Sequence, residues 1–409
     1  MKKLSRIMLG AVVSIGGIAA STQSQAVPAF ARQTGMACNA CHMQTFPALN
    51  VFGRSFKGSG YRLIGKEEEV KAFDLGLPVV LNASLVSKFR YQKTNGADPK
   101  VGTNTGELQF PDEAALLIGG RAGEHVGFLA EIATFGTADT SSGDFSLIGG
   151  MKIIFHHEMG GIDFGFVPFT TDGGGAGYGM ELLNTGAMRS QRVGEERKAL
   201  MAQQYLGLGA GEAEGFALTA SNPMGFVNFS LWAPKHGTFA AKQLAPYFRA
   251  AVTPSIGGWD TGLGVQYYTG KAVERDTSTG LDVDLVTKGW SIDGQLQGAV
   301  GGMPVGVYAA YGNAPKGTVF NTKANDHTAW SVHTQIGVLP RMTLLAGYLS
   351  ADNGTATGNR DNAFTLGGTY AFAQNVQIQL SHVMFSGNKY DVAQKAGDNR
   401  TMLMLFSAF

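Results

Sequence analysis

One short stretch of the chain has the residue types and the spacing to carry chemistry. It reads Cys38-Asn39-Ala40-Cys41-His42, which is the pattern Cys-x-x-Cys-His. Two thiols at this spacing can add across the two vinyl groups of a haem, and the adjacent histidine can reach the iron from one face. The motif therefore predicts one covalently bound haem c, with Cys38 and Cys41 as attachment sites and His42 as an axial ligand of the iron.

Other uses of this cysteine pair fit the sequence less well. A thioredoxin-like redox pair expects a βαβ context, which the surrounding residues lack. A zinc site needs two more ligands, and His42 is the single histidine between residues 27 and 124. A plain disulfide leaves the histidine without a role. These comparisons favour haem attachment.

The sixth ligand of the iron stays open at this point. Met36 and Met43 are so close to the attachment site that reaching the opposite face of the haem would strain the chain. A ligand from the later part of the chain is the alternative, and its seven histidines are His125, His156, His157, His236, His327, His333 and His382. Each of them is also an ordinary polar residue for a turn or a lumen.

The first 26 residues are typical of an export signal. Three basic residues occur within the first six, and an uncharged, mostly apolar run follows from 7 to 20. Ser24-Gln25-Ala26 then offers small residues for cleavage, so the mature chain is expected to begin at Val27. The apolar run is shorter than the ~20 residues of a spanning helix, which disfavours an inner-membrane anchor.

Composition limits the class of protein. The 409 residues carry a net charge of +1, and 15% are charged, against about 25% in an average soluble domain. Hydrophobic residues make up 44%, which excludes disorder. The near-zero charge offers no attraction for nucleic acid. An exported chain with 58 glycines and few charges is expected to be a soluble β protein or an outer-membrane barrel.

From about Leu77 onward, apolar and polar residues alternate with the period of a β-strand. One face of the first such segment holds Leu81, Ala83, Leu85, Ser87, Phe89 and Tyr91, and the other holds Asn82, Ser84, Val86, Lys88 and Arg90. A soluble sandwich would show the same alternation. The connections discriminate better, because short ones (340–341, 373–374) take turns with long polar ones (351–362, 386–400). This is the asymmetry of outer-membrane barrels.

Counting back from the C-terminal Phe409 and requiring both ends to be periplasmic predicts about sixteen strands, with fourteen or eighteen as alternatives. The count needs one very long connection, Thr170 to Glu212, expected as an outer loop or as a loop folded into the lumen. Its glycine-rich part, 172–179, lacks the lysine of a phosphate loop. Its charged part, Arg189 to Lys198, is expected to be a solvated short helix.

The predicted fold is therefore all-β: an antiparallel outer-membrane β-barrel with a small haem segment before it. We expect a signal peptide at 1–26, a monohaem cytochrome c-like segment at 27–75 and a porin-like barrel at 76–409. The haem segment has fewer than fifty residues, too few for a core of its own. A sixteen-stranded barrel is wide enough to accept it, so we expect it to plug the lumen or its periplasmic mouth.

The residues flanking the motif add a resemblance. Residues 28–36 (PAFARQTGM) and 46–57 (FPALNVFGRSFK) resemble the fused monohaem cytochrome–porin family of outer-membrane iron oxidases, closely over 28–65 and by pattern and length beyond. The resemblance implies an oxidoreductase that takes electrons from extracellular Fe(II) and passes them through one haem to a periplasmic c-type cytochrome or another soluble carrier. It also implies that the haem is surrounded by Phe46, Pro47, Leu49, Asn50, Phe52 and Arg54.

Two other functions remain open. The chain could conduct electrons for a different extracellular donor or acceptor, or it could be a passive porin with a structural haem. The sequence has no dense carboxylate cluster that would mark an iron site. Its candidate acidic residues in outer loops are interpreted as solvated charges, and they are Asp139, Asp144, Asp352 and Asp361. In every version the partner of the barrel is outer-membrane lipid of a Gram-negative cell.

Overall fold

The computed structural model describes residues 28–44, 46–63, 68–72, 75–133, 148–189, 191–391 and 395–409. The expected signal peptide at 1–26, its cleavage point at Val27 and the loop carrying Asp139 and Asp144 lie outside the described residues. Within the described part of the chain, no helix is long and apolar enough to cross a membrane.

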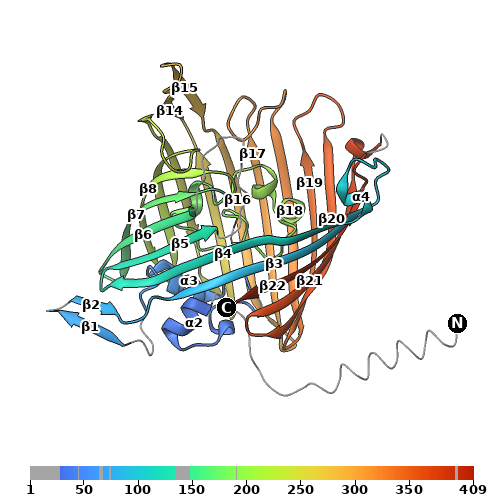
Figure 1. Cartoon of the computed structure of the whole chain (residues 1–409). Coiled ribbons are helices and arrows are strands. Elements are labelled where there is room, and N and C mark those ends of the chain that lie inside the picture. The colour runs from blue at the N-terminus through green and yellow to red at the C-terminus, as the bar shows by residue number, and fades with distance from the viewer. Residues whose placement is uncertain are drawn as a thin grey trace, which may run out of the picture.

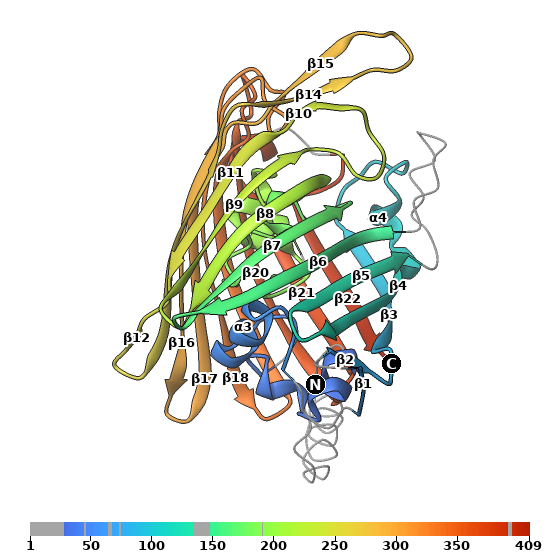
Figure 2. The same ribbon diagram turned by 90° about the vertical axis from the view of Figure 1, so that its left-hand side faces the viewer.

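The described strands close into one antiparallel barrel (Figures 1 and 2). Sixteen strands form its wall, which confirms the predicted number. They are β3 (Ala83–Thr94), β4 (Glu107–Gly123), β5 (Val126–Ala133), β6 (Ile148–Met159), β7 (Ile162–Thr171), β8 (Ala213–Asn222), β9 (Gly225–Ala233), β11 (Ala245–Val252), β13 (Trp259–Tyr268), β16 (Gly289–Val300), β17 (Met303–Ala314), β18 (His327–Leu339), β19 (Met342–Asp352), β20 (Arg360–Ala373), β21 (Val376–Ser386) and β22 (Asn399–Ala408). The ring closes where β22 pairs with β3, in a register that places Met402 opposite Gln92. The two-residue strand β12 (Ser255–Ile256) extends the β11–β13 turn.

The strands alternate between an exposed, mainly apolar outer face and a buried inner face, which is polar in most strands and apolar in β22, where Met402, Met404 and Phe406 are buried. In β16, Trp290, Ile292 and Leu296 are exposed on the outside, whereas Asp293 and Gln295 are buried inside. The aromatic face expected for 81–91 is likewise outward, with Leu85 and Tyr91 exposed and Lys88 buried. A closed wall with an apolar exterior and a polar interior is the solution for strands that cross lipid.

The two ends of the barrel differ as predicted. Tight turns at 160–161, 301–302 and 340–341 join strands at the end where the C-terminus lies (Figure 1). Longer connections lie at the other end, where β10 (Ala241–Gln243), β14 (Lys271–Arg275) and β15 (Asp282–Val286) form a small projecting sheet. The chain is an outer-membrane barrel, and the end with the tight turns is its periplasmic end.

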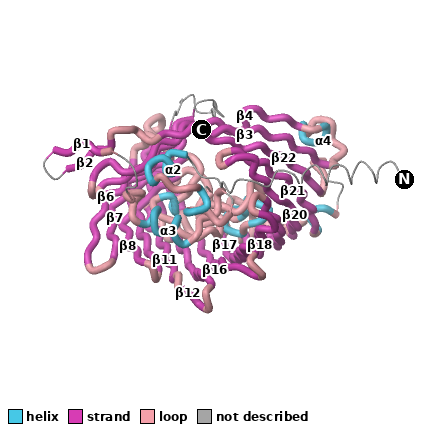
Figure 3. Tube along the Cα trace, turned by 90° about the horizontal axis from the view of Figure 1, so that it is seen from below, coloured by secondary structure: helices cyan, strands magenta, loops and turns pink. Residues whose placement is uncertain are grey.

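The barrel begins later than the alternation suggested. Residues from Leu77 onward were expected to start the wall, but Leu77 belongs to β2 (Leu75–Pro78), which pairs only with β1 (Glu69–Ala72). This hairpin lies outside the ring of strands when the barrel is seen from below (Figure 3). The first strand of the wall is β3, which starts at Ala83.

Two segments fill the lumen. The N-terminal segment (residues 28–63) contains α2 (Pro28–Thr34), η1 (Cys38–Ala40) and α3 (Val51–Gly58), and it lies within the ring at the periplasmic end (Figure 3). The inner loop (residues 172–212) joins β7 to β8 and contains η2 (Ala176–Tyr178), α5 (Arg197–Leu200) and α6 (Ala202–Tyr205). The expected plug is therefore present, and the long connection folds into the lumen. The remaining short helices, α4 (Gly102–Thr105) and η3 (Asn388–Tyr390), lie in outer loops.

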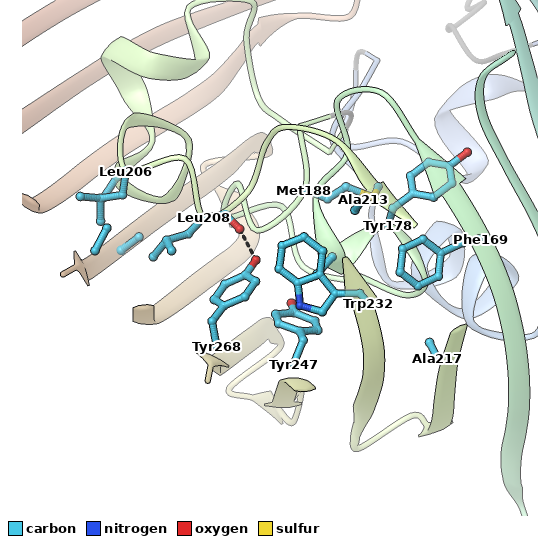
Figure 4. Packing of buried hydrophobic residues seen from close by; sticks show 14 of the residues in the cluster. Phe169, Tyr178, Met188, Leu206, Leu208, Ala213, Ala217, Trp232, Tyr247 and Tyr268 are labelled. Atoms are coloured by element: carbon cyan, nitrogen blue, oxygen red, sulfur yellow. Dashed lines mark hydrogen bonds between the residues drawn. The ribbon is translucent and has the colours of Figure 1, made fainter. Parts of the chain in front are cut away.

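Buried ion pairs hold the inner loop against the wall. The guanidinium of Arg249 in β11 lies 2.7 Å from Glu181 of the loop and 2.5 Å from Asp293 of β16, and all three side chains are fully buried. Charges this deep are retained only when they are paired. The same loop also packs against aromatic side chains of the wall, which include Trp232. The hydroxyl of Tyr268 in β13 donates to the carbonyl of Leu208 in the loop (Figure 4).

The prediction of a solvated helix over Arg189–Lys198 is wrong. Helix α5 starts only at Arg197, and Glu195 is buried, where it pairs with Arg192 and lies 3.1 Å from the ammonium of Lys88. The charges face the polar wall of the lumen rather than water. The partner from β3 is more than a hundred positions away in the sequence, so the local pattern could not indicate the burial.

Candidate functional site

The Cys-x-x-Cys-His motif forms a tight turn at the periplasmic end of the lumen. The turn closes through η1, in which the amides of Cys41 and His42 both donate to the carbonyl of Cys38, at 3.2 and 3.0 Å. Neither cysteine is in a disulfide. Cys38 is 3% exposed, and its Sγ lies 3.5 Å from Oε1 of Gln374 in the β20–β21 turn. The wall of the barrel thus holds one end of the motif.

His42 is buried and has one ring nitrogen engaged. Its Nδ1 lies 3.3 Å from the carbonyl oxygen of Pro47, which can only accept, so Nδ1 carries the proton and donates. Burial lowers the pKa of His42 to about 4, against the smaller opposing effect of hydrogen bonds to the backbone at Pro47 and Ala48. The imidazole is therefore neutral, and Nε2 keeps the lone pair that a metal ion requires.

The motif borders a cavity of about 140 Å³ between the N-terminal segment, the inner loop and the wall. The lining is mainly apolar and aromatic. Its members in the N-terminal segment include Phe30, Cys38, Cys41, His42, Phe46, Pro47, Leu49, Phe56 and Tyr61. The inner loop adds Tyr178, Met188 and Gln191, and the wall adds Leu129 and Lys152.

A helix cap and a glycine place the motif against α3. Asn50 is the N-cap of α3: its Oδ1 accepts from the amide of Gly53 at 2.9 Å, and its Nδ2 donates to the carbonyl of Ala40 at 3.0 Å. An added Cβ at Gly53 would lie 2.1 Å from the carbonyl oxygen of Cys41. Only glycine permits this approach of helix to motif.

The structure divides the six residues that the resemblance placed around a haem. Phe46, Pro47 and Leu49 line the cavity, and the Phe46 ring also stacks on Phe406 of β22 at 4.9 Å. Asn50, Phe52 and Arg54 are outside the lining: Asn50 caps α3, Phe52 is 37% exposed, and Arg54 forms two 2.6 Å contacts with Asp260 of β13.

Among the described residues, His42 is the single histidine that lines the cavity. The other soft donors in the lining are the thioethers of Met36 and Met188. Met43 instead accepts a hydrogen bond from the hydroxyl of Tyr308, at 3.6 Å. The inner-loop residues Tyr178 and Met188 were not predicted, because nothing in their sequence neighbourhood links them to the motif.

The donor set fits a covalently attached haem. Two thiols outside any disulfide and an imidazole with an available Nε2 border a cavity whose other walls are apolar rings and aliphatic side chains. No group of three or more histidine, cysteine, aspartate or glutamate side chains suited to a metal ion occurs among the described residues.

Comparison with known proteins finds similarity at the level of the barrel. No family description and no curated protein matches the chain. A loop L8 deletion mutant of OmpT, an outer membrane protein of Vibrio cholerae, is 12% identical over 81% of this chain and 99% of its own, with a TM-score of 0.46. The outer membrane channel DcaP of Acinetobacter baumannii is 14% identical over 83% and 99%, with a TM-score of 0.47. The barrel itself is defined by its own closed pairing, and the site by its own residues.

Proposed function

We propose that this outer-membrane barrel is a cytochrome–porin fusion that takes electrons from extracellular Fe(II) and passes them to a periplasmic electron carrier. The observation that carries the proposal is the position of the Cys-x-x-Cys-His turn. It borders an apolar cavity inside the barrel, at the periplasmic end. A carrier in the periplasm can approach this end, and the wall insulates the cavity from lipid.

Different residues of the site would hold different parts of the haem. Cys38 and Cys41 would hold haem c through thioethers, and Nε2 of His42 would bind its iron. When bound, a haem c supplies one-electron redox chemistry whose potential depends on axial ligands, burial and hydrogen bonds. Phe46, Leu49 and the other apolar lining side chains would exclude water from the haem faces.

The inner loop separates the cavity from the outer mouth. Its side chains are mostly buried, and Arg249 and Asn184 fix it to the wall and to the N-terminal segment. Each Fe(II) that arrives outside would lose one electron and stay outside as Fe(III), and the periplasmic carrier would gain that electron. Insoluble ferric product would thus form outside the cell.

The test is anaerobic mixing of the purified, haem-loaded protein with Fe(II) at a pH where electron transfer is favourable. We expect ferrous-haem absorption bands to appear at a rate that rises with Fe(II) concentration. The Cys38→Ser/Cys41→Ser variant is the control, because it keeps the barrel and should carry no covalent haem. Mass spectrometry of both mature proteins counts the attached haem.

Three outcomes would overturn the proposal. A mature wild-type protein without haem would remove its cofactor. A haem that dithionite reduces but Fe(II) does not, at a favourable measured potential, would favour a conduit for another donor or acceptor. A large single-channel conductance in planar bilayers would instead favour the passive porin.

A further inference from the structure

Two lysine side chains line the cavity, and they come from two separate parts of the chain. Lys57 lies in the last turn of α3, in the N-terminal segment, and Lys152 lies in β6 of the wall. Lys152 is 2% exposed, and Lys57 is partly buried. An ammonium group loses its hydration in such a place, so the burial has to be offset by a partner.

The described residues supply these ammonium groups with neutral partners. Nζ of Lys152 donates to the carbonyl of Tyr178 at 2.9 Å and lies 4.7 Å from the centre of that ring. Nζ of Lys57 donates to Oε1 of Gln191. Neither lysine forms an ion pair with a carboxylate among the described residues, although Lys88 in the same lumen has Glu113 at 2.6 Å and Glu195 at 3.1 Å.

Each ammonium therefore has hydrogen-bond capacity to spare, since it carries three donors and uses one on a described partner. Burial lowers the pKa of Lys57 to about 8, and the Glu181 carboxylate opposes that effect. Two cations beside an apolar cavity are the pattern expected when the occupant is itself apolar and carries negative groups.

We propose that Lys57 and Lys152 pair with the two carboxylate arms of a haem attached at Cys38 and Cys41. This inference rests on the proposed function, because it presupposes that haem. It accounts for all three features of the cavity: thiols where the vinyl groups bond, apolar walls along the macrocycle, and ammonium groups for the propionates. The two lysines are positioning residues that also act on the potential, because a nearby cation favours the ferrous haem, which is one charge more negative than the ferric form.

The experiment compares midpoint potentials of purified, haem-loaded variants. Lys57→Met and Lys152→Met should each lower the potential, and the double variant should lower it further. The potential of these variants should also vary more with pH, because an unpaired propionate takes up a proton in the accessible range. The resonance Raman bending bands of the propionates should shift in the same variants.

The controls separate charge from packing. Lys57→Arg keeps the cation and should keep the wild-type potential. Lys93→Met removes an exposed lysine whose Nζ also donates to a backbone carbonyl, that of Asn104, and should change nothing. If Lys152→Met does not assemble, the partly buried Lys57 carries the test.

The outcomes also separate this inference from the function. Full haem occupancy with an unchanged potential and unchanged propionate bands in Lys57→Met overturns the lysine pairing and leaves the proposed function standing. Absence of covalent haem from the wild-type protein overturns both. If the variants have a lowered potential and Fe(II) reduces neither the wild-type haem nor the variant haem, the lysine pairing is supported and iron oxidation is overturned.

Discussion

Arg54 attaches the N-terminal segment to the barrel wall, and its removal should release the segment. Its guanidinium makes two 2.6 Å contacts with the carboxylate of Asp260 and a third contact of 3.3 Å with Gln297. Removing one partner of a buried ion pair costs about 3–5 kcal/mol. Because the Asp260 side chain keeps 12% exposure, we take the lower end of that range. Arg54→Met should therefore weaken docking by about 3 kcal/mol, roughly a hundredfold in the docking equilibrium.

Hydrogen exchange of the folded protein in detergent measures this effect directly. The amides of α3, such as that of Arg54, which donates to Asn50 at 3.0 Å, should exchange roughly a hundredfold faster in Arg54→Met, while the strands keep their protection. Arg54→Met/Asp260→Asn should recover most of the loss, because no buried charge is left alone. Lys271→Met breaks an ion pair whose side chains are 43% and 53% exposed, and should leave α3 unchanged. Unaltered exchange in α3 of Arg54→Met, with an intact barrel, would refute the reasoning.

Three further results are expected from the same structure. Gly53→Ala places a Cβ 2.1 Å from the Cys41 carbonyl, so the motif must move; the covalent haem yield should fall sharply, as haem-stained gels and mass spectrometry would report. Arg249→Met leaves the buried carboxylates of Glu181 and Asp293 without a cation, at a cost of about 3–5 kcal/mol; the freed inner loop should raise single-channel conductance, and an unchanged conductance would contradict this role. Burial lowers the pKa of Lys57 from 10.5 to about 8. In haem-free Cys38→Ser/Cys41→Ser protein, the docked state therefore holds fewer protons than the undocked state between these values, so docking should weaken as pH falls through this window and level off below about 8. The added substitution Lys57→Met should abolish that dependence in hydrogen exchange.

The wall of the barrel could be predicted because its rules are local. A strand needs only alternation, as in Trp290-Ser291-Ile292-Asp293, and the alternating short and long connections set the number of crossings. The start of the wall was placed too early, because the hairpin of β1 and β2 shares the strand pattern but pairs only with itself. Alternation of apolar and polar residues indicates that a segment is extended, but it does not indicate the strand with which the segment pairs.

The interior could be predicted only in part. The motif itself was recognisable from spacing, and Asn50 ahead of α3 is an ordinary N-cap residue. The burial of the inner loop could not be predicted, because a charged stretch is solvated or buried according to the residues that face it. Glu195 is buried because its carboxylate pairs with Lys88 of the wall at 3.1 Å, and Lys152 borders the cavity because β6 forms part of the wall beside it. Such encounters depend on closure of the whole ring.

The cavity therefore belongs to the assembled molecule rather than to a cytochrome domain. Helices α2 and α3 have seven and eight residues, shorter than helices that are stable alone in water. They are held by distant groups: the amide of Ala29 donates to Ser84 of β3 at 2.7 Å, and Leu49 exchanges two 2.8 Å hydrogen bonds with Asn184 of the inner loop. Each wall of the cavity is fixed by another part of the chain, so a bound haem would stabilise the barrel interior as a unit. Substitutions in the inner loop should therefore change the reduction potential of the haem even when the attachment motif is unaltered.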